Sequence, residues 1–146
     1  MKNKDSSPLQ VRTLIAQTES LLAARERALF ASHGLCTSDL AILRYLQKKG
    51  PKSVNQIAPK VGLTSGSMTT ATQRLRKREF VTTSRNEKDG RRVSVEITKT
   101  GKQSLRALTS EREKLFEPIL KNFSDREAKI LTGLLKKINK AQRVNS

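Results

Sequence analysis

The fold is decided by residues 64–98, which read TSGSMTTATQRLRKREFVTTSRNEKDGRRVSVEIT. The first half of this stretch has a helical period, because Met68, Ala71 and Leu75 fall on one face of a helix over residues 64–79. Thr64 is a typical N-cap residue, whose hydroxyl can accept a hydrogen bond from a free backbone N–H. A helix of this length extends about 24 Å and suits the major groove of duplex DNA. Its opposite face carries small or polar residues: Gly66, Thr70, Gln73 and Lys77.

After Phe80 the apolar period changes to two. Val93, Val95 and Ile97 alternate with polar residues, as in a half-buried strand. Asp89-Gly90 is a hairpin-turn pair, so the sequence predicts a two-stranded ribbon. Basic residues crowd the tip of this ribbon: Arg85, Lys88, Arg91 and Arg92. A polar-faced helix followed by a basic ribbon predicts a unit that reads DNA.

The charge balance points to the same partner. Lys and Arg number 30 against 13 Asp and Glu, which gives a formal charge of +17 over 146 residues. No acidic residue lies between Leu40 and Arg78, so the positive charge is concentrated around the proposed reader. This pattern favours double-stranded DNA as the partner. Aromatic residues are few, which argues against binding modes that stack single-stranded bases.

Several other classes of protein are disfavoured. One Cys and one His cannot form a disulfide or a zinc site, and no cofactor is expected. No nucleophile–base–orienter set or phosphate-binding glycine loop is evident, so we do not expect an enzyme. The N-terminal residues contain no apolar run, and no stretch approaches the roughly 20 apolar residues of a membrane span. We expect a soluble, cytoplasmic protein with no membrane partner.

Two helices are expected ahead of the reader, after a loose tail at residues 1–8. The first spans residues 9–32, and the second spans residues 37–49 with Thr37 or Ser38 as its cap. Both carry apolar residues at helical spacing.

A short helix should follow, because Ser53 and Gln56 have the spacing of a capping box. Pro59 would cost about 3 kcal/mol in a helix interior, so this helix should be short or kinked. Gly62 then breaks the chain before Thr64. Two short helices separated by a glycine-containing turn predict a helix-turn-helix.

Two long helices are expected after Thr98, the last one opened by a capping box at Ser124 and Glu127. The first and last helices of the chain repeat Leu and Ile at spacings typical of a seam between helices. A dimer interface explains these helices economically, because two-fold DNA sites are read by two-fold proteins. Packing within one subunit is the alternative. The candidate interface residues are Leu14, Leu21, Leu131, Leu134, Leu135 and Ile138.

Residues 34–102 resemble the MarR family of bacterial transcriptional regulators, most specifically in LTSGSMTTATQRLRKREFV and DGRRVSVEITKTG. The resemblance implies a mainly α fold with a small β-hairpin wing (α+β). Residues 37–98 would form the winged helix-turn-helix, and residues 9–36 and 99–146 the flanking dimerisation helices. Members are usually dimeric repressors, often released from DNA by a small phenolic or other anionic effector or by oxidants. The family's wing element matches Asp89, which would stabilise the hairpin, and Arg91, which would enter the minor groove.

The candidate DNA contacts combine the reader helix, the ribbon and the short helix before them. Short hydroxyl side chains near a helix N-terminus can bind phosphates or base edges. Gln73 could pair with adenine, and Arg74 could reach guanine or a phosphate. The full set is Ser53, Thr64, Ser65, Gly66, Ser67, Thr69, Thr70, Gln73, Arg74, Lys77, Arg85, Arg91 and Arg92.

Cys36 admits two interpretations. A buried, inert thiol is the simpler one, supported by the neighbouring Leu35. A thiol switch is the other, with His33 lowering the pKa of the thiol. The organic-hydroperoxide sensors of the MarR family carry their reactive Cys inside the first helix, whereas Cys36 lies at the junction of the first and second helices, so their mechanism does not transfer directly. The main hypothesis is therefore a ligand-modulated dimeric repressor; the alternatives are a redox-sensing regulator and a non-specific architectural DNA-binding protein.

Overall fold

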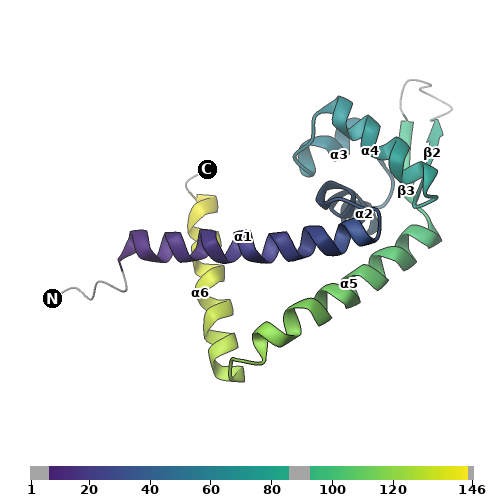
Figure 1. The fold of residues 1–146 in the computed structure, drawn as a ribbon. Coiled ribbons are helices and arrows are strands. Elements are labelled where there is room, and N and C mark those ends of the chain that lie inside the picture. Colours follow the sequence, from purple (N-terminus) through teal and green to yellow (C-terminus); the bar gives the residue numbers. More distant parts are fainter. Residues whose placement is uncertain (1–6, 86–92, 145–146) are drawn as a thin grey trace. The chain divides into compact units, whose positions relative to one another are not determined.

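The computed structural model describes residues 7–85 and 93–144, and divides the chain into two compact units, Met1–Ser110 and Glu111–Ser146. The described part is mostly helical with one small sheet (Figure 1). Helix α5 runs across the boundary between the units. The elements are α1 (Pro8–Ser32), α2 (Thr37–Lys49), β1 (Lys52–Ser53), α3 (Val54–Ile57), the 3₁₀ turn η2 (Ala58–Lys60), α4 (Ser65–Lys77), β2 (Val81–Arg85), β3 (Val93–Ile97), α5 (Lys99–Leu120) and α6 (Asp125–Val144).

Helix α1 begins earlier than predicted. The backbone N–H of Gln10 donates to the Ser7 hydroxyl (3.1 Å), and Pro8 occupies the first turn, where its missing N–H costs nothing. The last two residues of the predicted tail, Ser7 and Pro8, are therefore the helix start. The C-terminal end is as predicted, with His33 as the C-cap and Gly34 in the left-handed region at φ 64°.

Helix α2 is capped by Cys36, so the prediction of Thr37 or Ser38 as the cap is wrong. The Cys36 backbone is extended, and its carbonyl accepts the first helical hydrogen bond from Leu40 (3.2 Å). The Asp39 carboxylate accepts from the Cys36 N–H (3.0 Å). This acidic residue in the first turn fixes the helix start one residue before the hydroxyl residues that usually take this position.

The segment after α2 contains the predicted capping box and the predicted interruption by proline. Ser53 N–H donates to the Gln56 side chain (2.9 Å), and Gln56 N–H donates to the Ser53 hydroxyl (3.3 Å). Helix α3 is a single turn, and Pro59 lies in the 3₁₀ turn that follows it. Gly62, at φ 70°, then redirects the chain into α4.

The sheet has three antiparallel strands in the order β1-β3-β2, rather than the two that the sequence predicted. In the ribbon, Val81 pairs with Ile97 and Arg85 with Val93. The added strand, β1, pairs Lys52 with Val95. Two residues are too few to show a period of two, so the sequence pattern does not reveal this strand.

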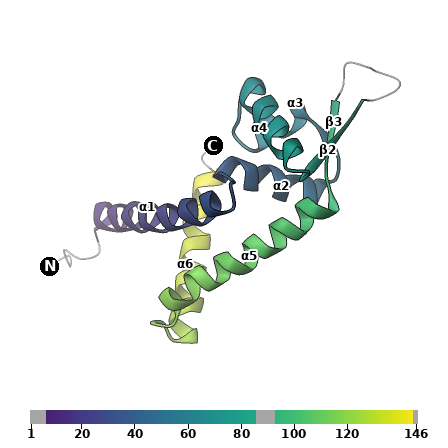
Figure 2. The ribbon, with the colours of Figure 1, turned by 45° about the vertical axis from the view of Figure 1, so that its right-hand side comes forward.

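The core of the first unit lies between α2, α4, the sheet and the first half of α5. The two views show α4 beside β2 and β3 and next to α2 (Figures 1 and 2). All three residues predicted for the inner face of α4, namely Met68, Ala71 and Leu75, are buried. The other core residues are Phe30, Leu35, Leu40, Ile42, Leu43, Leu46, Ile57, Ala58, Phe80, Val81, Val95, Ile97, Leu105 and Leu108.

Helix α6 forms most of the second unit and begins at the predicted capping box. Ser124 N–H donates to the Glu127 carboxylate (2.8 Å), and Glu127 N–H donates to the Ser124 hydroxyl (3.3 Å). The apolar residues of this helix are exposed, in contrast with those of α4. Among residues 7–85 and 93–144, no helix is both long and apolar enough to cross a membrane.

Candidate nucleic-acid interface

Helix α4 presents a face of small and polar residues to solvent. Helical geometry places Gly66, Thr70, Gln73 and Lys77 in line on this face, and all four are exposed. Thr64 caps the helix as predicted: its hydroxyl accepts from the Ser67 N–H (3.2 Å). With the apolar face held in the core, this outer face is available to a partner.

Two exposed threonines of α4, Thr69 and Thr70, use their hydroxyl protons within the helix. Thr69 donates its hydroxyl proton to the Ser65 carbonyl (2.9 Å), and Thr70 donates to the Gly66 carbonyl (3.2 Å). Because each hydroxyl proton is used inside the helix, the oxygen lone pairs remain to accept from a base amino group. The methyl groups can also contact a thymine methyl.

Gly66 is not required by packing. A Cβ added there would meet no heavy atom within 4 Å outside the helix, and the backbone is helical. Glycine costs stability in a helix relative to alanine. The packing of the chain therefore gives no reason for a glycine at this exposed position.

A groove of about 560 Å³ lies along one flank of α4, between this helix, α3 and the strands. Side chains of both helices and of the ribbon line it, including Gln56, Gln73, Arg76 and Thr83. The predicted contact Ser53 also lies here, half-buried and engaged in the α3 cap. Arg76, which the sequence analysis did not select, contributes the positive charge on this flank.

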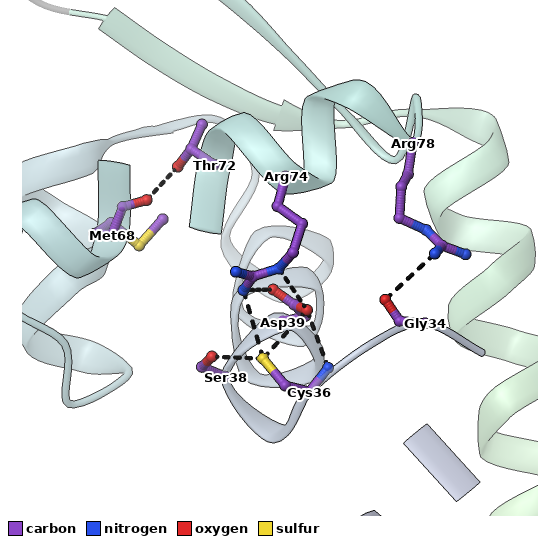
Figure 3. A network of polar contacts seen from close by, with 8 residues as sticks. All are labelled: Gly34, Cys36, Ser38, Asp39, Met68, Thr72, Arg74 and Arg78. Carbon is purple, nitrogen blue, oxygen red and sulfur yellow. Dashed lines mark hydrogen bonds and ion pairs between the residues drawn. The ribbon is translucent and has the colours of Figure 1, made fainter. Parts of the chain in front are cut away.

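Arg74, a predicted DNA contact, forms an ion pair with Asp39 of α2. Its Nε donates to Asp39 Oδ2 (3.2 Å), and its Nη2 donates to Asp39 Oδ1 (2.5 Å), as Figure 3 shows. The Asp39 residue is fully buried (0% exposed), whereas the Arg74 side chain keeps 41% of its surface exposed. The hydrogen bond to Asp39 raises the pKa of the Arg74 guanidinium above its ordinary value.

Cys36 is exposed, so the expectation of a buried thiol is wrong. Leu35 fills the core while the next side chain points outward. The thiol lies beside the ion pair, with Sγ donating to Asp39 Oδ2 (3.2 Å) and lying 3.0 Å from Ser38 Oγ. Arg74 Nη2 is 3.5 Å from the same sulfur.

Arg78, the C-cap of α4, connects this helix to the end of α1. Its Nη2 donates to the His33 carbonyl (2.7 Å) and its Nη1 to the Gly34 carbonyl (3.3 Å). The guanidinium also lies 5.0 Å from the centre of the Phe80 ring, in cation–π geometry.

Sequence reasoning missed the roles of Asp39 and Arg78. Their partners lie 35 and 45 residues away, too far for any local period to reveal. The sequence does single out Asp39 in one respect: it is the last acidic residue before the span from Leu40 to Arg78, which contains no Asp or Glu.

Of the remaining predicted residues, some lie within the described part of the chain and others lie outside it. Ser65, Ser67 and Arg85 are exposed, on the first turn of α4 and at the end of β2. Asp89, Arg91 and Arg92 lie outside the described residues. The six predicted interface residues are exposed in their own units, with Leu21 at 69% and Leu134 at 52%.

Comparison with known proteins links this arrangement to DNA-binding regulators. The model of the MarR family matches residues 37–93. The HTH-type transcriptional regulator YxaD of Bacillus subtilis is 32% identical over 104 residues, covering 71% of this chain and 73% of that protein.

Solved structures of other proteins share the fold. A MarR family protein from Bacillus stearothermophilus superimposes with a TM-score of 0.83 at 18% identity, covering 98% of this chain and 99% of that chain. An S. aureus MepR mutant bound to an oligodeoxyribonucleotide gives a TM-score of 0.67 at 16% identity, with coverages of 90% and 97%.

Proposed function

Because this chain belongs to the MarR family and its relatives are transcriptional regulators, we propose that it represses transcription as a homodimer on a pseudo-palindromic operator. The observation that carries the proposal is the outer face of α4. This face is small, polar and positively charged, and the apolar face behind it is fixed in the core. Such a helix can enter a major groove without further folding.

In this proposal α4 reads bases and its surroundings bind the backbone. Gln73 pairs with adenine through its amide, and the Thr69 and Thr70 oxygens accept from base amino groups. Gly66 allows the helix backbone to approach the groove. Lys77 and Arg85 contact phosphates, and Arg91 and Arg92 extend the contact to the neighbouring backbone or minor groove. The MepR mutant bound to an oligodeoxyribonucleotide has the same fold, which supports DNA as the partner.

The exposed apolar residues of α1 and α6 support the proposed dimer. Both helices leave Leu and Ile side chains in solvent that a second copy would cover. Two copies would then present two α4 helices to half-sites about 34–36 Å apart.

Regulation by a small phenolic or other anionic effector is the part of the proposal that rests on resemblance to the family alone. The effector would change the spacing of the two α4 helices and so release the operator. Titration of salicylate into the protein–operator complex tests it, with benzyl alcohol as the uncharged control.

The experiment that tests the proposal is selection of duplexes from a random pool, followed by titration of the selected and scrambled duplexes at several salt concentrations. Tight, selective binding of a two-fold symmetric sequence is the expected result. Equal affinity for both duplexes, with a steep fall in affinity as salt rises, would replace the proposal with an architectural role.

A second candidate function, a thiol-sensing regulator, is favoured by one observation. The exposed Cys36 thiol lies against the Asp39–Arg74 pair that connects α2 to the reader helix. Oxidation there would disturb the position of α4. In this case, peroxide should release the selected duplex from the wild-type protein and not from the Cys36→Ser variant.

A further inference from the structure

We propose that Arg74 and Arg78 are positioning residues, which fix the orientation of α4 on the junction between α1 and α2 instead of contacting DNA. The junction is the segment His33–Asp39. The inference rests on the proposed function, because the orientation matters only if α4 reads DNA. It also replaces the direct base or phosphate contact expected for Arg74 with an indirect role.

The two arginines lie one turn apart on the same flank of α4. A spacing of four residues places Arg78 directly below Arg74, away from the outer line of Gly66, Gln73 and Lys77. This flank faces the junction, whereas Arg76 lies on the opposite flank, in the groove beside the strands. The three arginines near the end of α4 therefore divide between two tasks.

Arg74 holds the start of α2. Its two donors form a fork on the Asp39 carboxylate, whose other hydrogen bonds come from the N–H and the thiol of Cys36. A carboxylate that is fully buried requires its charged partner, since removing one member of such a pair leaves an uncompensated charge. If Arg74 turned these donors toward a base or a phosphate, the buried Asp39 carboxylate would lose its charged partner. The geometry therefore keeps Nε and Nη2 of this guanidinium on Asp39 and away from DNA.

Arg78 holds the end of α1. The carbonyls of His33 and Gly34, which accept from it, follow the last turn of α1, where backbone acceptors lack helical partners and the helix dipole is negative. The junction leaves room for this contact. A Cβ at Gly34 would lie 2.2 Å from Arg78 Nη1, and the backbone there has a φ of 64°.

Together the contacts attach α4 to both ends of one short segment. Arg78 binds where α1 ends, and Arg74 binds where α2 begins. Any rearrangement of this junction must therefore either carry α4 with it or break one of these contacts. In this way the junction sets the direction in which Thr70, Gln73 and Lys77 point.

The direction in which Asp39→Asn changes DNA affinity distinguishes a positioning role of Arg74 from a direct DNA contact. Asp39→Asn removes a negative charge close to the DNA-binding helix, which on electrostatic grounds alone would tighten DNA binding. Positioning predicts the opposite, because the fork that orients α4 is lost. Arg74→Met should act like Asp39→Asn, and the double variant should be no worse than either single one.

The experiment uses the full chain and the duplex selected with the wild-type protein. We expect Asp39→Asn and Arg74→Met each to weaken selective binding about tenfold, with a non-additive double variant and an unchanged salt slope. Arg76→Met is the matched control, which should lower the salt slope by about one unit. Arg74→Lys, which keeps the charge and one donor, should restore part of the affinity. The proposal is overturned if Arg74→Met lowers the salt slope by one unit, or if Asp39→Asn binds the duplex as well as or better than wild type.

A second measurement, hydrogen exchange in α4 without DNA, decides the inference if a variant folds poorly or the wild-type protein selects no duplex. Absence of selection contradicts the proposed function alone. Faster exchange in α4, with the β2–β3 strands unchanged, is expected for Asp39→Asn, for Arg74→Met and for the gentler Arg78→Gln. Arg76→Met should exchange like wild type. Exchange in α4 that is equal in all four variants would overturn the positioning role.

Discussion

Helices α4 and α6 are both amphipathic, but they expose opposite faces. In α4 the apolar residues Met68 and Leu75 are fully buried within the chain, and the polar face meets solvent. In α6 the apolar residues Leu131 and Leu134 are exposed. The contrast separates two kinds of surface. The α4 surface is stable in water and suits a polyanion, whereas the α6 surface costs free energy until another apolar surface covers it.

The largest effect should come from making the exposed face of α6 polar. Charged residues at Leu131 and Leu134 should prevent dimerisation and weaken operator binding by about 10²-fold or more, because the second half-site no longer adds to the affinity. Sedimentation and duplex titration on the same samples measure both losses. Lys136→Gln, on the opposite side of α6, is the control and should stay dimeric. A doubly charged variant that sediments as a dimer would mean that α6 is not the interface.

A smaller effect is expected from the polar face of α4. Gln73→Ala should cost about 1–3 kcal/mol in operator binding and relax the preference at one base position in each half-site. Repeating the duplex selection with the variant measures both. Loss of affinity with an unchanged base preference at every position would show that Gln73 does not read a base.

The sequence predicted much of this contrast, because a helical period identifies the faces of both helices. It also predicted the capping boxes at Ser53 and Ser124 and the short helix around Pro59. Strand β1 was too short to leave a period. The Asp39–Arg74 pair was invisible for another reason: a charged residue on a helix flank looks the same in sequence whether it meets solvent, DNA or a buried carboxylate.

Gly66 allows stability and binding to be measured separately on the same face. Gly66→Ala should raise the free energy of unfolding by about 0.5–1 kcal/mol, since the site is helical and open. Operator binding should nevertheless weaken, because the added methyl group stands between the helix and the groove. Thermal unfolding and duplex titration test the two parts. Stabilisation without loss of binding would show that the backbone at Gly66 does not approach DNA.

The smallest effect concerns the start of α6. Hydrogen bonds from the Ser124 backbone and hydroxyl lower the pKa of the Glu127 carboxyl, so the cap contributes stability when this group is ionised. That contribution is present above the ordinary carboxyl pKa and is lost as the pH falls through the lowered one. A helicity titration in acid should show this loss, and Glu127→Gln should remove it. Identical titrations of the two proteins would contradict the role of the cap.

The central claim is that two copies of α4 read one duplex while the exposed apolar residues of α1 and α6 join the copies. The most direct measurement is sedimentation of the protein with a labelled selected duplex and with its scrambled counterpart, at increasing protein concentration. The account predicts a complex of two chains on the selected duplex that forms at much lower concentration than any complex with the scrambled one. The claim would be contradicted if protein chains bound one after another to both duplexes at the same concentrations, without a preferred complex of two chains.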